Sequence, residues 1–79
     1  MVEVRWTVGA RNDLREIVEF IAQDSVAYAT AVADRMLQSV ERLVDHPRLG
    51  RVVPEYRDRS LRELIVGSHR IVYRIEAGR

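Results

Sequence analysis

The segment from Ser60 to Glu76 constrains the fold more than any other part of the chain, because it predicts two strands joined by a tight turn. Gly67 and Ser68 form the predicted turn, since glycine tolerates the positive φ that short hairpin turns require. Apolar, β-branched or aromatic residues suited to half-buried strands lie on both sides of it: Leu61, Leu64, Ile65, Val66, Ile71, Val72, Tyr73 and Ile75.

A two-residue turn would fix the register of this hairpin. The expected pairs are Val66–His69, Ile65–Arg70, Leu64–Ile71, Glu63–Val72 and Arg62–Tyr73. Opposed residues share a face. Leu64, Ile71, Tyr73 and Ile75 would then face the helices, and the open face would carry Leu61, Glu63, Ile65, Arg70, Val72 and Arg74. A three-residue loop would instead invert the first strand, with Leu61 and Ile65 inside and Arg62 outside. In both registers Arg70 and Arg74 face away from the helices, and at least one strand edge stays uncovered and able to accept a partner strand.

The N-terminal segment predicts a further strand. Residues 2–8 alternate strictly, with Val2, Val4, Trp6 and Val8 on one side, so we expect a strand whose buried face includes Trp6 as a core residue.

Two helices are expected after this strand. Thr7 is the expected N-cap of the first helix, which should end near Gln23. Its apolar residues have helical spacing and form a stripe that Phe20 could widen: Ala10, Leu14, Ile17, Val18 and Ile21. Ser25 is the expected N-cap of the second, which Pro47 ends. The short connection makes the helices antiparallel neighbours.

The region between the second helix and the hairpin, residues 47–59, is expected to be an irregular loop because it holds Pro47, Gly50 and Pro54. It also carries Arg48 and Arg51, which favour a basic rim beside the sheet. The whole pattern predicts one α+β domain over residues 1–79: an N-terminal strand, an antiparallel helical hairpin and a C-terminal antiparallel β-hairpin, forming one small sheet with the helices on one face.

Composition narrows the classes of function. All 13 basic residues are arginine, 12 residues are acidic, and the net charge is +1. Strong unspecific nucleic-acid binding needs a large basic excess, so any such contact would have to come from local clusters of arginine. No cysteine is present, and no apolar run approaches the ~20 residues of a membrane span. We therefore expect a cytoplasmic protein without a membrane association.

No motif for a metal, a cofactor or a nucleophile occurs, so none of these is expected. Acid–base chemistry would have to use His69, Glu63, Tyr73 and arginines of the hairpin. Arg70 could hold a phosphate, or it could form an ion pair with Glu3, Glu63 or Glu76. The residues themselves leave both interpretations open.

Two stretches carry a family resemblance: residues 46–55, HPRLGRVVPE, and residues 61–74, LRELIVGSHRIVYR. Together with Ala10, Asp13, Leu14 and Ile17 of the first helix, they resemble the ParE branch of the RelE/ParE toxin superfamily, over nearly the whole chain. The resemblance implies the toxin of a type II toxin–antitoxin system, which causes growth arrest and serves plasmid stabilisation. It implies neutralisation by a ParD-like antitoxin that wraps the helices and the sheet in a hetero-oligomer, contact with DNA only through that antitoxin, and DNA gyrase as the target.

The expected antitoxin- or target-binding residues are arginines of the loop and the hairpin: Arg48, Arg51, Arg62, Arg70 and Arg74. The RelE branch implies an alternative, a ribosome-dependent mRNA endoribonuclease in which Arg70, with Arg62 as the nearest further basic residue, would contact the substrate. A third interpretation is a shortened, non-toxic member that only binds antitoxin, since the last strand and tail of the family have no counterpart here.

Overall fold

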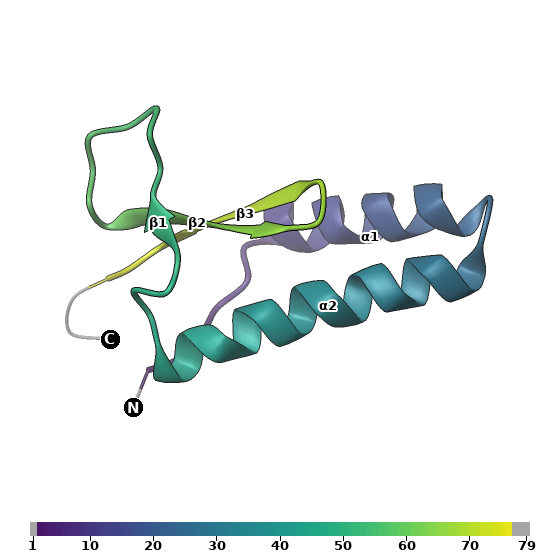
Figure 1. The fold of residues 1–79 in the computed structure, drawn as a ribbon, viewed down its shortest axis with the longest axis horizontal. Coiled ribbons are helices and arrows are strands. Elements are labelled where there is room, and N and C mark those ends of the chain that lie inside the picture. The colour runs from purple at the N-terminus through teal and green to yellow at the C-terminus, as the bar shows by residue number, and fades with distance from the viewer. Residues whose placement is uncertain (1, 77–79) are drawn as a thin grey trace. The chain divides into compact units, whose positions relative to one another are not determined.

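The computed structural model describes residues 2–76, which divide into two compact units (Figure 1). One unit comprises Arg5–Gln38, and the other comprises residues 2–4 together with residues 39–76. The elements follow the order α1 (Val8–Ala22), α2 (Val26–Asp45), β1 (Arg51–Val52), β2 (Leu61–Val66) and β3 (His69–Arg74). This is the predicted α+β fold, with two helices followed by an antiparallel sheet.

Side-chain caps begin both helices at the predicted residues. The hydroxyl of Thr7 accepts a hydrogen bond from the backbone N–H of Ala10 at 3.0 Å, and the hydroxyl of Ser25 accepts one from Tyr28 at 3.0 Å. Each bond satisfies a donor that a helix N-terminus leaves without an intrahelical partner. Helix α1 ends at Ala22, with Gln23 as its C-cap, and the N-terminal part of α2 returns antiparallel to it (Figure 1).

The apolar stripe of α2 is real but narrower than its sequence suggests. The buried residues on this helix recur at helical spacing: Ala29, Val32, Met36, Val40 and Leu43. Leu37 and Val44 of the same helix are exposed. On α1, Phe20 is 71% exposed, so the prediction that it widens the apolar stripe is wrong.

The sheet has three antiparallel strands in the order β1-β2-β3. Strands β2 and β3 pair from Leu61–Arg74 to Val66–His69, which confirms the register of the two-residue turn at every predicted pair. Gly67 has φ 62°, and no residue other than glycine has positive φ in the described part of the chain. A positive φ at the first central residue alone is typical of a type II′ turn, whose twist suits a hairpin.

Two of the predicted elements differ from the structure. The N-terminal strand over Val2–Val8 is not formed: residues 2–7 belong to no regular element, and Val8 is exposed in the first turn of α1. The alternation survives as alternating burial, with Trp6 half-buried, because an extended chain has that periodicity whether or not it joins a sheet. The second difference is β1, which lies in the segment predicted to be irregular and pairs Arg51 with Glu63 and Val52 with Arg62.

The cap of α1 gives a first test. We expect Thr7→Ala to lower the free energy of unfolding by about 1 kcal/mol, because the N–H of Ala10 loses its acceptor. Thr7→Ser keeps the hydroxyl and is expected to leave stability nearly unchanged. Urea unfolding followed by circular dichroism measures both variants, and equal losses for the two would show that the hydroxyl does not stabilise the helix.

Candidate functional site

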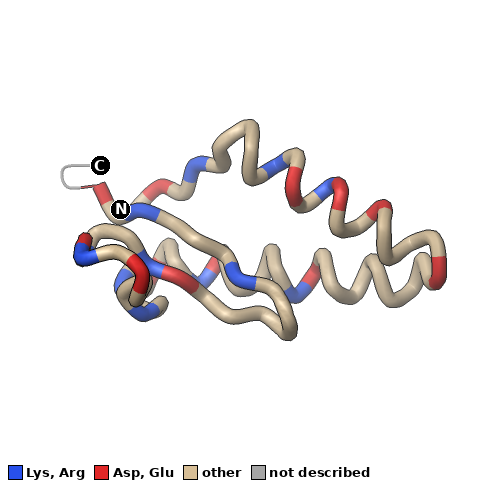
Figure 2. The backbone as a smooth tube through the Cα atoms, turned by 90° about the horizontal axis from the view of Figure 1, so that it is seen from above, with Lys and Arg blue, Asp and Glu red and all other residues tan. Residues whose placement is uncertain are grey.

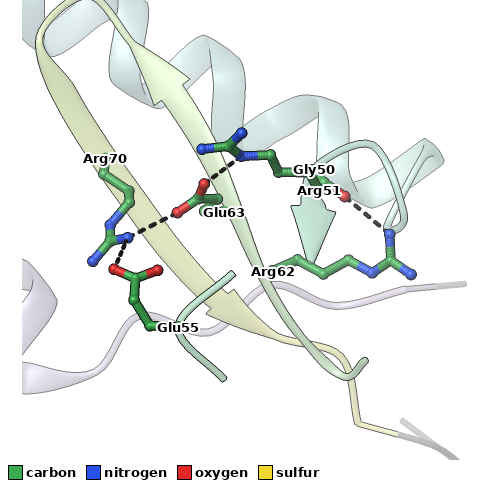
Figure 3. A network of polar contacts seen from close by, with 6 residues as sticks. All are labelled: Gly50, Arg51, Glu55, Arg62, Glu63 and Arg70. Carbon is green, nitrogen blue, oxygen red and sulfur yellow. Dashed lines mark hydrogen bonds and ion pairs between the residues drawn. The ribbon is translucent and has the colours of Figure 1, made fainter. Parts of the chain in front are cut away.

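The buried carboxylate of Glu63 organises one face of the sheet (Figure 3). Its side chain is 0% exposed, and it lies on β2 between two arginines from the neighbouring strands. Arg51 of β1 donates from Nε to Oε2 at 2.5 Å, and Arg70 of β3 donates from a terminal nitrogen to Oε1 at 3.1 Å. Both carboxylate oxygens are thus bonded to cations, as a buried charge requires.

The loop that follows β1 supplies two further carboxylates to the same face. Glu55 accepts a hydrogen bond from Arg70 at 2.7 Å, and Asp58 accepts one from Arg74 at 2.9 Å. The other oxygen of Asp58 accepts from the backbone N–H and the hydroxyl of Ser60, at 2.9 and 2.6 Å. Asp58 therefore forms an Asx-type turn directly before β2 as well as an ion pair with β3.

These contacts shift the pKa values of the loop acids. The hydrogen bonds from Ser60, with the hydrogen bond from Arg74, lower the pKa of Asp58 from 3.8 to about 2. The hydrogen bond from Arg70 lowers the pKa of Glu55, and the same carboxylate raises the pKa of Arg70. Each shift favours the ionised form, so all three groups stay charged at neutral pH.

The opposite face of the sheet is held by Tyr73 and Arg62. The hydroxyl of Tyr73 donates to the carbonyl of Pro47 at 2.8 Å and accepts from the N–H of Gly50 at 2.9 Å. Arg62 donates to three backbone carbonyls, those of Gly50 at 3.0 Å, Arg59 at 3.3 Å and Arg48 at 3.4 Å. A side chain at Gly50 has no room, because a Cβ there would lie 2.5 Å from the carbonyl oxygen of Glu63 and 2.8 Å from the hydroxyl oxygen of Tyr73.

The structure brings three of the predicted binding residues together. Arg51, Arg70 and Arg74 lie on the face of the sheet that carries Glu63, and all three are exposed. Arg62 pairs with Tyr73 and is therefore on the other face, where its guanidinium binds the loop backbone. Arg48 is exposed beside that loop, and its carbonyl accepts the bond from Arg62.

The basic rim is also interleaved with acids. Figure 2 shows blue and red segments alternating along the loop and strands of the sheet, and α1 likewise carries both signs. Of the two interpretations of Arg70, the ion pair is the one seen: its partner Glu63 was among those predicted, whereas Glu55 was not.

Other kinds of site have less support in residues 2–76. That part of the chain contains no group of three or more His, Cys, Asp or Glu side chains placed to hold a metal ion. None of its helices is long and apolar enough to cross a membrane.

Comparison with known families decides the identity of the chain. Residues 4–79 match the family described as the ParE toxin of the type II toxin-antitoxin system, parDE. The chain belongs to the ParE toxin family. It is therefore the toxin type of a type II system, in which an antitoxin is the partner. No curated protein and no solved structure gives a significant match.

The contacts explain why the two stretches that resemble ParE toxins occur together. Gly50, Arg51 and Glu55 of the first stretch contact Tyr73, Glu63 and Arg70 of the second. Sequence reasoning missed the roles of Glu55 and Asp58. The Asp58-x-Ser60 spacing is the available signal for the turn, whereas nothing local predicts that Glu55 reaches β3, fifteen residues further on.

The Tyr73 hydroxyl gives a second test. We expect Tyr73→Phe to lower the free energy of unfolding by about 1–3 kcal/mol, because Pro47 and Gly50 lose their partner in a half-buried position. Tyr56→Phe is the matched control, since that side chain is exposed, and it should change stability little. Chemical unfolding of both variants measures the difference, and equal stabilities would contradict the assigned role of the hydroxyl.

The Asp58 carboxylate gives a test by pH. Its folded pKa of about 2 lies below the ordinary aspartate pKa of 3.8, so its contribution to stability is fully present above about pH 4 and is lost as the pH falls through about 2. Carbon-detected NMR titration of the carboxyl group should give a midpoint near the folded value. Ser60→Ala should raise that midpoint because it removes the hydroxyl donor, and a wild-type midpoint near 4 would refute the turn.

Proposed function

We propose that this chain is the toxin of a ParDE-like pair and acts in the cytoplasm by binding other proteins. In this proposal a cognate ParD-like antitoxin neutralises it in a hetero-oligomer, and DNA is contacted only through the antitoxin. The resemblance to the ParE branch supports DNA gyrase as the target, with growth arrest and plasmid stabilisation as the consequences.

One observation carries the binding proposal: an exposed face of the sheet combines cations with apolar side chains. Arg70 and Arg74 of β3 flank Val72, which is 47% exposed, and Ile65 of β2 lies diagonally beside Val72 and is 59% exposed. Arg51 adds a third cation on the same face. Apolar surface rimmed by charge is typical of a protein-binding site, and the arginines favour a partner that carries carboxylates.

The outer edge of β3 supplies backbone groups to the same partner. Ile75 donates its N–H to the carbonyl of Ser60 at 2.7 Å, so this opposed pair is of the hydrogen-bonded kind. Such pairs alternate with non-bonded pairs along an antiparallel ladder. Arg70, Val72 and Arg74 therefore point their backbone N–H and C=O groups away from β2, and no strand of residues 2–76 pairs with them.

The charges at this edge disfavour a second copy of the chain as the occupant. Antiparallel pairing of two β3 strands about Val72 would place Arg70 of one copy opposite Arg74 of the other. Like charges directly opposite each other destabilise a strand pair. An antitoxin segment with the pattern acidic-x-apolar-x-acidic fits the same edge, because its carboxylates would face the two arginines.

Arg62 and Arg48 have other roles in the proposal than the three arginines on the exposed face. We assign Arg62 the role of positioning the loop, since its donors are used by backbone carbonyls, and Arg48 the role of an outer contact. The ribonuclease alternative has less support, because Arg62 and Arg70 lie on opposite faces of the sheet and do not converge on one phosphate.

The arginines of β3 can be tested with a purified cognate antitoxin. We expect Arg70→Ala with Arg74→Ala to weaken antitoxin binding by roughly tenfold or more, because partner carboxylates lose two charged donors. Arg42→Ala with Arg35→Ala, both exposed on α2, changes the net charge equally and is expected to have a smaller effect. Calorimetry of the purified pair measures both, and equal weakening would place the antitoxin elsewhere.

The target is tested by expressing the chain alone. The proposal predicts growth arrest that co-expressed antitoxin relieves, with inhibition of DNA supercoiling by purified gyrase. Cleavage of mRNA on ribosomes would identify the ribonuclease alternative. Absence of growth arrest together with tight antitoxin binding would identify a non-toxic member.

A further inference from the structure

We propose that the guanidinium of Arg70 is a seat for a partner's carboxylate, and that Glu55 fills this seat in the free protein as a built-in competitor. This inference rests on the proposed function. It concerns how binding is regulated at the docking face, the exposed face of the sheet that carries Arg51, Ile65, Arg70, Val72 and Arg74. It follows from a difference between the two carboxylates that Arg70 binds (Figure 3).

One of these carboxylates is permanent and the other is exchangeable. Glu63 is 0% exposed and also binds Arg51, so its contact with Arg70 at 3.1 Å belongs to the interior of the sheet. Glu55 is 54% exposed and contacts Arg70 at 2.7 Å from the solvent side. Both carboxylates accept from the same guanidinium nitrogen, Nη1 of Arg70. If Glu55 left, Arg70 would keep its orientation through Glu63, and the N–H of Nη1 that Glu55 had bound would face solvent.

The loop does not need the Glu55 contact to keep its course. Val53 is buried and donates its N–H to the carbonyl of Leu61 at 3.1 Å, and Tyr56 donates to the carbonyl of Val53 at 3.2 Å. Asp58 is anchored separately through Ser60. Glu55 therefore sits between two backbone-anchored points, where its side chain can swing away without unfolding the loop.

The second pair, Arg74 with Asp58, is a poorer candidate for exchange. Asp58 is held by Ser60 whether or not Arg74 is present, and Arg74 also donates to the hydroxyl of Ser60 at 3.1 Å. A partner's acid at Arg74 would have to compete with a carboxylate that Ser60 also holds beside it. Arg70 is thus the position at which a partner can replace the protein's own acid.

A carboxylate is the ligand class that this seat selects. The guanidinium fork of arginine matches the geometry of a carboxylate, and the occupant in the free protein is itself one. The backbone groups of Arg70 point outward along the open edge of β3, so a strand added there would bring its own side chain to the same guanidinium.

The experiment compares Glu55→Gln with wild type in the full chain, using a blocked peptide of alternating glutamate and valine as the probe. Glu55→Gln removes the competing charge, so we expect the peptide to bind roughly two- to fivefold more tightly. This change in affinity corresponds to the free energy of a partly exposed ion pair. Glu41→Gln on the exposed surface of α2 makes the same change in net charge and should leave affinity unchanged. In the Arg70→Ala background, Glu55→Gln should have no effect, which isolates the coupling of the two residues.

Backbone amide shifts in NMR titrations report where the peptide binds. Shifts along β3 with tighter binding by Glu55→Gln support the seat. Shifts along β3 with equal affinity for wild type and Glu55→Gln would overturn the competitor role and leave the docking face standing. If no variant shows shifts along β3, both the seat and the docking face of the proposed function are wrong.

Discussion

The ion-paired carboxylate of Glu63 is the interaction on which the sheet depends. A buried carboxylate without partners would be strongly destabilising, and here two arginines from different strands compensate it. Arg51 is consequently bound twice, by the ladder to β2 and by the carboxylate. This double attachment explains how a strand of only two residues, β1, keeps its place beside β2.

Side chains on both faces of the hairpin hold the loop of residues 47–59, and each face uses a different kind of contact. On one face, Arg70 and Arg74 bind acids of the loop through ion pairs that remain partly in water. On the other face, Tyr73 and Arg62 bind its backbone through neutral and charge-assisted hydrogen bonds, and Gly50 provides the close approach. The stretches that identify the family are therefore the two halves of one contact network. Both stretches are needed to form this network, so the fold alone is a reason for them to occur together.

The sequence predicted the parts of the fold that depend on local chemistry. The caps at Thr7 and Ser25, the turn at Gly67 and hence the whole register of β2 and β3 follow from rules that act over a few residues. Prediction from the sequence was wrong where the structure depends on pairing between segments that are distant in the sequence. Residues 2–7 have the alternation of a strand but do not form one, and β1 forms beside Pro54 because β2 offers a ladder partner. For the same reason the arginines were predicted individually, whereas their acidic partners Glu55 and Asp58 were not.

Self-neutralised arginines have a consequence for recognition. A partner that binds this face as proposed would meet cations that already hold carboxylates. It would exchange one ion pair for another and gain less from charge than it would on a bare basic patch. Such exchange favours specificity over affinity, because a partner whose acids do not match the spacing leaves the original pairs intact. Most of the affinity would then come from apolar contact with Ile65 and Val72 and from the outward-facing backbone groups of β3. A net charge of only +1 is compatible with a docking face of this kind, since in the proposed exchange Arg70 becomes available to a partner only after Glu55 has moved away.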